Sequence, residues 1–149
     1  MSDFDIRAIK LGSDITAEDI CDDLDFLDDW EERYRYIIDL GKQLPPLPDD
    51  LKTEDRFVRG CQSQVWLETN YDEAQNQLLM AVDSDALIVK GLAAMVLAAL
   101  NQKTPQQIVD YDMNSYFERI DLLKHLSPTR GNGVKSMVGR IQNEAQNRL

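Results

Sequence analysis

The most constraining segment of the chain is residues 86–100, because almost every side chain in it is apolar. The run is shorter than the roughly 20 apolar residues of a membrane-spanning helix, and Lys90 and Gly91 interrupt it. On a helix, its apolar positions leave almost no polar face, which is typical of a helix buried on all sides. The segment therefore predicts a central helix that the other elements must cover.

Two runs of alternating side chains predict the sheet that lies against this helix. Residues 65–71 alternate between apolar and more polar side chains, residues 78–82 do the same, and residues 72–76 between them are polar and turn-like. Phe57 and Val58 predict a short additional strand. We expect an α+β domain, with a small antiparallel sheet of about three strands and helices packed on one of its faces.

Helix start signals flank this sheet on both sides. A capping residue followed three positions later by an acidic or amide side chain, or a proline at the first helical position, is typical of a helix N-terminus. Such signals occur at Thr16, Asp29, Thr104 and Ser127, and Ser84 is expected to cap the central helix. The sequence predicts the other helical segments at residues 16–27, 30–42, 105–110, 114–124 and 128–149.

The remaining segments are expected to be irregular. Residues 44–48 (LPPLP) cannot continue a helix. We interpret them as a stiff extended connector that lays the chain back across the core, rather than as a ligand for an aromatic-groove domain. Residues 1–15 show no clear period and are expected to form a loose N-terminal arm. Residues 16–149 then form a single domain, whose length is typical of one compact unit.

The charge balance argues against several classes of function. The chain of 149 residues has a net charge of -11 and a pI of about 4.4. Its sequence shows no basic stripe for binding nucleic acid, and an acidic surface is unsuited to anionic membranes. Residues 1–10 lack the apolar core of a signal peptide, so we expect a cytoplasmic protein with reduced thiols.

The sequence offers few metal ligands. Its two cysteines, Cys21 and Cys61, and its one histidine, His125, follow no CxxC or HxxxH spacing, so they predict no zinc site. We interpret Cys21 as a packing residue of the first helix, and His125 as a capping or packing residue near the end of a helical segment. Asp83 and Asp85 flank the start of the central helix, and we interpret them as capping charges.

Cys61 is the candidate for sulfur chemistry. Gly60 before it can adopt backbone angles that other residues avoid, which would present the thiol at a loop tip. Arg59 would share a face with Cys61 in an extended strand, where its charge would lower the pKa of the thiol, and Gln62 adds hydrogen-bonding groups. The same pattern fits a buried structural cysteine, and composition and spacing alone favour that alternative.

Four motifs are spread over residues 16–149. They are residues 30–41 (WEERYRYIIDLG), 60–66 (GCQSQVW), 83–92 (DSDALIVKGL) and 125–130 (HLSPTR), the last followed by Gly133. In this order they resemble the SufE family of sulfur acceptors for cysteine desulfurases. The paralogous CsdE proteins share most of these motifs, and the GCQSQVW string is more similar to SufE proper.

The resemblance implies a fold like that of iron–sulfur scaffold proteins and a role in iron–sulfur cluster assembly. A cysteine desulfurase of the SufS or CsdA type would hold sulfur as a persulfide, and the Cys61 thiolate would take the outer sulfur. A SufBCD-like scaffold complex would receive it next. The pyridoxal phosphate belongs to the desulfurase, so the resemblance implies no cofactor on this chain and an accessory protein rather than an enzyme.

The resemblance also leaves alternatives open. With only Cys61 in the matching region, a carrier is favoured over a cluster scaffold, but the chain could instead be a CsdE-type partner or a docking regulator without sulfur chemistry of its own. A homodimer is compatible with either function. A carrier must protect its sulfur, so we expect Cys61 to be partly shielded and the Gly60 loop to move when a partner binds.

Arg130 lies in one of the four motifs and in the first turn of the last predicted helix. A positive charge at this position opposes the helix dipole. Arg130 is therefore either a tolerated surface residue or a residue that faces Cys61 or a partner. Our hypothesis is that it stabilises the Cys61 thiolate or docks the desulfurase.

Overall fold

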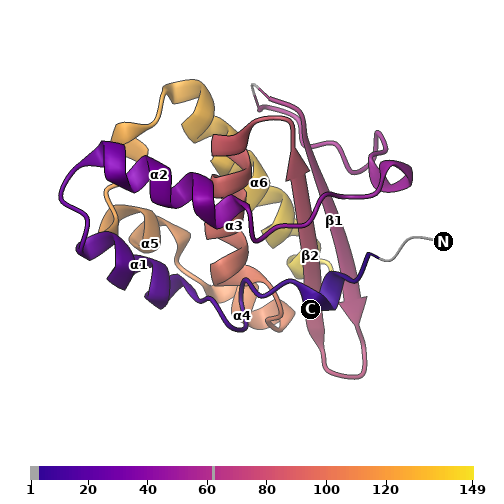
Figure 1. Ribbon diagram of the computed structural model, residues 1–149. Helices are drawn as coiled ribbons and strands as arrows, with labels where there is room; N and C mark the ends of the chain where they lie inside the picture. The colour runs from indigo at the N-terminus through magenta and orange to yellow at the C-terminus, as the bar shows by residue number, and fades with distance from the viewer. Residues whose placement is uncertain (1–3, 62) are drawn as a thin grey trace.

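The computed structural model describes residues 4–61 and 63–149. A β-hairpin lies along one side of the molecule, helices gather on the other, and α3 runs through the centre (Figure 1). This is the expected α+β arrangement. The elements follow in the order η1 (Ile6–Ala8), α1 (Ala17–Asp25), α2 (Trp30–Gly41), η2 (Asp49–Leu51), β1 (Val65–Asp72), β2 (Gln77–Ser84), α3 (Leu87–Leu100), α4 (Pro105–Asp110), α5 (Met113–Arg119), η3 (Leu123–His125) and α6 (Pro128–Gln146).

The sheet of the described chain has two strands, so the prediction of a third strand is wrong. β1 and β2 pair antiparallel along their whole length. Phe57 makes only an isolated bridge to Trp66 of β1. Turns at residues 54–56 and 59–60 lie on either side of this bridge, and they leave the segment too short to continue the pairing.

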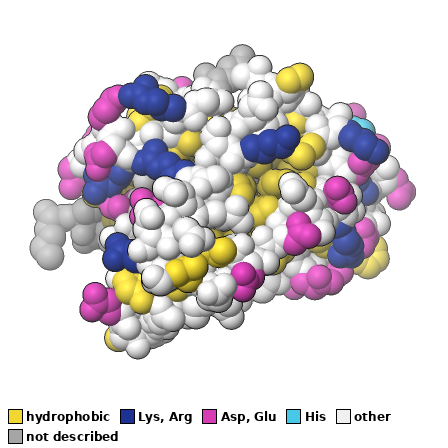
Figure 2. Space-filling view, turned by 180° about the vertical axis from the view of Figure 1, so that it is seen from behind, with side chains coloured by type: hydrophobic (Ala, Val, Ile, Leu, Met, Phe, Trp, Pro, Cys, Tyr) yellow, Lys and Arg dark blue, Asp and Glu magenta, His cyan; other side chains and the backbone are white. Residues whose placement is uncertain are grey.

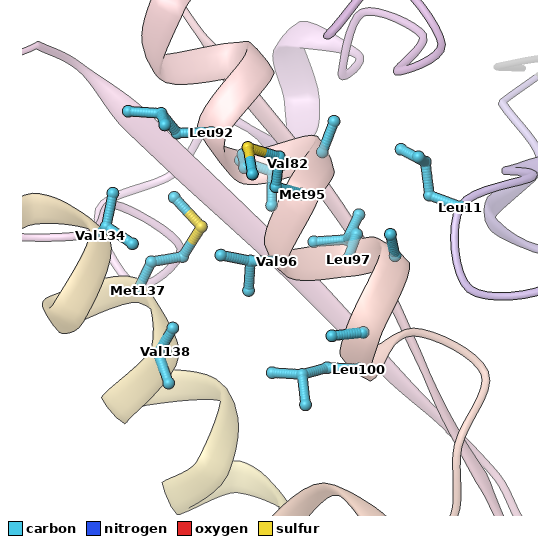
Figure 3. Close-up of a cluster of buried hydrophobic side chains, with 14 of the residues drawn as sticks. Leu11, Val82, Leu92, Met95, Val96, Leu97, Leu100, Val134, Met137 and Val138 are labelled. Carbon is cyan, nitrogen blue, oxygen red and sulfur yellow. The ribbon is translucent and has the colours of Figure 1, made fainter. Parts of the chain in front are cut away.

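α3 is buried along most of its length, as its sequence predicts. It packs against β2, α2 and α6, and truncating one of its fully buried leucines to alanine is expected to cost about 2–5 kcal/mol. Figure 3 shows the cluster that α3 forms with its neighbours. The labelled side chains are Leu92, Met95, Val96, Leu97 and Leu100 of α3, Val134, Met137 and Val138 of α6, Val82 of β2, and Leu11.

The N-terminal half of α3 is fixed by a backbone contact with α2. A Cβ atom on Gly91 of α3 would stand 2.2 Å from the carbonyl oxygen of Ile37, far closer than any real side-chain contact. A Cβ atom on Gly41, the last residue of α2, would stand 2.7 Å from the nitrogen of Gly91. The two helices therefore meet backbone to backbone, which sets the position of the α3 residues that line the site described below.

Residues 4–15 pack on the domain, so the expectation of a loose arm is wrong for this part of the chain. Ile9 and Leu11 are buried, and the buried side chain of Asn101 ties the arm to the core. Its Nδ2 donates to the Leu11 carbonyl and its Oδ1 accepts from the Met80 backbone N–H, both at 2.9 Å. Long-range bonds of this kind leave no period in the sequence. Residues 1–3 lie outside the described residues.

The helix N-termini lie close to their predicted positions, with one exception. Thr16 and Thr104 form capping boxes, and the side chains of Asp29 and Ser127 accept hydrogen bonds from the first turns of α2 and α6. The prediction that Ser84 caps α3 is wrong. Ser84 is the last residue of β2, and α3 begins at Leu87 without a side-chain cap.

The connector at residues 44–48 lies on the core, as predicted, and Asp83 holds it there. The buried Leu47 donates its backbone N–H to the Asp83 carboxylate at 2.9 Å, and Lys52 and Lys90 pair with the same carboxylate at 3.5 and 3.3 Å. Burial acts to raise the pKa of Asp83, but the backbone N–H groups of Leu47 and Ser84 and the charge of Lys90 hold it below its ordinary value. Asp83 is a buried anchor rather than the helix cap we expected.

Candidate functional site

Cys61 lies in the loop between the Phe57 bridge and β1, with its sulfur against α6. Its Sγ is 3.6 Å from the carbonyl oxygen of Gly133, and the side chain is half-buried, which confirms the expected partial shielding. The sulfur lines a small apolar pocket whose free space is about the size of one water molecule. The lining residues are Cys61, Val89, Leu92, Thr129, Arg130, Gly133, Val134 and Met137, several of which are visible in Figure 3.

Two glycines allow the loop to lie directly on α6. Gly60 has φ +89°, a left-handed conformation that other residues rarely adopt, and a Cβ atom there would stand 2.8 Å from Ser136 Oγ. A Cβ atom on Gly133 would stand 3.2 Å from the Cys61 sulfur. Gly60 thus turns the chain as the sequence suggests, but the turn brings the thiol toward the helix rather than to an exposed loop tip.

Side chains far away in the sequence hold both ends of this loop. Arg140 of α6 donates from Nη1 to the Phe57 carbonyl at 2.6 Å and from Nη2 to the Asp55 carbonyl. On the other side, the Asp85 carboxylate accepts from the Gln64 backbone N–H at 3.0 Å. Our interpretation of Asp85 as a helix cap is therefore wrong. It holds the loop beside Cys61.

The arginines near Cys61 in the sequence do not act on its thiol in this conformation. Arg59 is mostly exposed and pairs with Glu54, and Arg56 pairs with Glu68 at 3.2 Å. Burial alone raises the pKa of Cys61. The expectation that Arg59 lowers this pKa is wrong here, because the turn at Gly60 breaks the strand alternation on which it depended. Gln62 lies outside the described residues.

Arg130 lies at the same pocket as Cys61. Its backbone N–H donates to Ser127 Oγ at 3.2 Å, which caps α6. Its side-chain Nε is buried and has no hydrogen-bond partner among the described residues. Arg130 also lines a neighbouring surface groove with Tyr34, Ile38, Ile88, His125, Leu126 and Ser127. The side chain therefore lines both the sulfur pocket and an open groove, and its Nε–H has no acceptor among the described residues.

Comparison with known proteins shows the family of this chain. The model of the SufE family, described as an Fe-S metabolism associated domain, matches residues 18–145. The chain belongs to the SufE family. An uncharacterized SufE-like protein of Rhizobium meliloti (strain 1021) is 47% identical over 136 residues, which cover 90% of this chain and 97% of that protein. A second, from Rhizobium etli, is 47% identical over 133 residues and covers 88% and 90%.

A solved structure shares the fold of this SufE protein. The solution structure of a hypothetical protein from Thermus thermophilus superposes with a TM-score of 0.71, and the match covers 88% of this chain and 93% of that one. The two are 16% identical in sequence, so this likeness concerns the fold alone. Family membership assigns the chain to iron–sulfur metabolism.

The other candidates from the sequence lie apart from the sulfur pocket. Cys21 is 4% exposed and belongs to the hydrophobic core, as expected of a packing residue. The His125 ring stacks on Trp30 with 4.1 Å between ring centroids, and the Tyr34 hydroxyl donates to the His125 carbonyl. His125 is a packing residue at the end of η3, beside the groove that Arg130 borders.

The sequence reasoning missed Arg140 and Ser136 altogether. Neither stands in a motif, and nothing in local spacing links residues of α6 to a loop about half the chain away. Asp85 did carry a signal, because it lies in the motif at residues 83–92, but its partner was not foreseeable. The residues that hold the thiol in place are thus known from the fold alone.

Three further observations concern the described part of the SufE domain. In residues 4–61 and 63–149, no three His, Cys, Asp or Glu side chains are grouped so that they could hold a metal ion. Within the same residues, no helix has the length and apolar character needed to span a membrane. On the face shown in Figure 2, Lys and Arg side chains are interspersed with Asp and Glu, and hydrophobic side chains gather near the centre.

Proposed function

We propose that this SufE protein accepts sulfur from a cysteine desulfurase onto Cys61 and carries it as a persulfide. The observation that carries the proposal is the setting of the Cys61 sulfur, which lies in a small apolar pocket with free space beside it. A cysteine that served packing alone would be surrounded closely on all sides. Membership of the SufE family supports the same function.

The transfer step follows thiol–disulfide exchange. The Cys61 thiolate attacks the outer sulfur of the persulfide on the desulfurase cysteine. The bond between the two donor sulfurs breaks, its electron pair leaves on the desulfurase cysteine as thiolate, and Cys61 becomes the persulfide. One sulfur–sulfur bond forms as one breaks, so the step needs no external oxidant or reductant.

The resting structure keeps this nucleophile inactive. Burial raises the pKa of Cys61, so the free protein holds the neutral thiol at physiological pH. We propose that the loop pivots at Gly60 when the desulfurase binds, which exposes the sulfur and restores its ordinary acidity. Arg130 then stabilises the thiolate or contacts the desulfurase, and Arg59 and Gln62 remain secondary candidates for the same roles.

The partners follow from the proposed chemistry. The desulfurase, of the SufS or CsdA type, supplies both the persulfide and the pyridoxal phosphate that generates it. A SufBCD-like scaffold complex is the proposed acceptor of the sulfur, and the cytoplasm, where thiols stay reduced, is the proposed location. The SufE protein contributes no catalytic turnover of its own but stimulates the desulfurase by removing its sulfur.

Intact-mass analysis tests the proposal. After incubation with a desulfurase, cysteine and pyridoxal phosphate, wild-type protein should gain at least one sulfur, about 32 Da. The Cys61→Ser variant should gain none, and the Cys21→Ala variant, which removes the other thiol, should load like wild type. Absence of an adduct on the wild-type protein, with an active desulfurase present, would contradict the proposal.

The docking-regulator alternative makes a different prediction. If Cys61 were only structural, Cys61→Ser would stimulate the desulfurase as strongly as wild type does. Our proposal expects the variant to bind the desulfurase but to lose the stimulation, because the persulfide on the enzyme is not removed. Sulfide release by the desulfurase, measured with and without each protein, separates the two.

A further inference from the structure

Gly133 is the α6 residue that lies directly beneath the Cys61 sulfur. A Cβ atom on Gly133 would stand 3.2 Å from Cys61 Sγ, 3.5 Å from its Cα and 3.6 Å from its Cβ. The first of these is tighter than ordinary van der Waals contact, so a methyl group here would push against the sulfur. The cysteine loop and the helix are therefore as close at this point as the absence of a side chain permits.

The other glycines of α6 have no such neighbour. A Cβ atom on Gly131 would meet only the end of the Leu123 side chain at 3.9 Å, and one on Gly139 would meet nothing within 4 Å. Glycine is a poor helix former compared with alanine. At Gly139 packing gives no reason for it, whereas at Gly133 the reason is the space that the cysteine sulfur occupies.

The space beside the sulfur is small and apolar. It holds about one water-sized particle, and the side chains of Val89, Leu92, Val134 and Met137 surround it. Arg130 also lines the pocket, and its Nε–H is buried without a hydrogen-bond partner among the described residues. The pocket thus has room for one additional atom beside the thiol, in apolar surroundings.

We propose that Gly133 sets the depth of this pocket, so that the sulfur added to Cys61 is held inside it and shielded from solvent. This inference rests on the proposed function. Gly133 acts as a positioning residue, because it touches Cys61 and determines where the outer sulfur lies. A methyl group at position 133 would take part of the space and turn the persulfide outward, where thiols and cyanide reach it.

The experiment compares Gly133→Ala with Gly139→Ala, a change of the same size in the same helix. Each protein is loaded by a desulfurase, separated from it, and exposed to cyanide, which removes the outer sulfur as thiocyanate and restores the Cys61 thiol. We expect Gly133→Ala to lose its sulfur at least about fivefold faster than wild type, and Gly139→Ala to lose it within about twofold of the wild-type rate. Equal rates for wild type and Gly133→Ala would overturn the proposal.

The unloaded proteins give a second readout that does not depend on sulfur transfer. We expect iodoacetamide to alkylate Cys61 at least about threefold faster in Gly133→Ala than in Gly139→Ala, because the thiol is displaced from the pocket. If wild type took up no sulfur, the proposed function would fail, while this comparison would still decide whether Gly133 shelters Cys61. Equal alkylation rates would then reject the role of Gly133.

A second pair of variants covers the case in which Gly133→Ala does not melt cooperatively. Val134→Ile adds one methylene to a residue that lines the sulfur pocket, and Val138→Ile adds it to a buried residue one turn further along α6 that does not. We expect Val134→Ile alone to accelerate the loss of sulfur to cyanide. Equal loss from both variants would show that the space beside Cys61 is not needed, and would overturn the proposal.

Discussion

The two cysteines of the chain lie in regions that differ in one decisive respect. Cys21 is part of α1 and of the continuous core, while Cys61 lies on a loop beside a pocket with free space. Burial raises the pKa of both thiols. At Cys21 the charge of Arg119 opposes this rise in pKa and nearby carboxylates add to it. At Cys61 the rise comes from burial alone.

The two thiols also differ in how firmly the fold fixes their surroundings. The environment of Cys21 belongs to the packed core and changes only if the domain unfolds. The environment of Cys61 depends on a loop that Arg140 and Asp85 hold in place by a few hydrogen bonds. A movement of that loop removes the burial and with it the whole pKa shift. A thiol can thus be kept inactive without being made permanently unreactive.

The largest effect should be seen when the two native thiols compete for an alkylating reagent. Cys61 can be exposed by a local loop movement, whereas Cys21 requires opening of α1, so we expect Cys61 to react at least about 100-fold faster. Peptide mapping after timed treatment with iodoacetamide measures both rates in one sample. Comparable alkylation rates would show that Cys61 is no easier to expose than Cys21, which would contradict this account.

Replacing Arg130 tests the charged residue that lines the sulfur pocket. Arg130→Ala should slow sulfur transfer from the desulfurase by about tenfold, while the melting temperature changes little because the side-chain Nε bonds to no described residue. Intact-mass analysis of samples quenched at successive times gives the rate of sulfur transfer. Arg35→Ala, which removes an exposed arginine that pairs with Glu31 on α2, is the matched control. A wild-type transfer rate in Arg130→Ala would show that Arg130 has no role in sulfur transfer.

Releasing the loop should make the two cysteines differ even more. Arg140→Ala removes the donors to the Phe57 and Asp55 carbonyls, so we expect Cys61 to be alkylated about fivefold faster and Cys21 at an unchanged rate. Arg140→Lys, which keeps one donor, should be intermediate. A parallel increase at both cysteines would mean that the variant destabilises the whole domain instead of the loop.

The smallest effect concerns pH. Because the folded pKa of Cys61 is raised, burial of the neutral thiol stabilises the fold fully below the unfolded pKa of about 8.5, and this contribution is lost as pH rises toward the folded value. We therefore expect the wild type to lose stability relative to Cys61→Ala above about pH 8.5, by less than about 1 kcal/mol. Urea unfolding at pH 7 and pH 9.5 measures the difference. An increase in relative stability would contradict burial of the neutral thiol.

The sequence allowed correct prediction where the information is local. The uniform apolar character of α3 and the caps at Thr16, Asp29 and Thr104 depend on neighbours along the chain, and these elements lie where expected. The arm at residues 4–15 was misjudged because Asn101, far away in the sequence, holds it. The prediction of a short additional strand was wrong because the length of that segment depends on turns, whose positions the apolar pattern does not reveal.

The candidate site likewise contains residues that the sequence could indicate and residues that it could not. The resemblance of the motifs pointed to Cys61 and Arg130, and the fold brings both to one pocket. Arg59 was expected to act on the thiol because it is near in sequence, yet it pairs with Glu54 on the other side of the turn. Arg140 fixes the loop from a distant position on α6 and left no signal in the sequence. The motifs therefore indicated the candidate thiol, whereas proximity along the chain did not indicate the residues that hold its loop in place.

The central claim is that Cys61, and not Cys21, receives the sulfur. The direct measurement is peptide mass mapping of the wild-type protein after brief loading by a desulfurase and trapping of persulfides with iodoacetamide. The account predicts an added sulfur, about 32 Da beyond the alkyl group, on the Cys61 peptide and none on the Cys21 peptide. Sulfur on the Cys21 peptide, or on neither peptide while the desulfurase turns over, would contradict it.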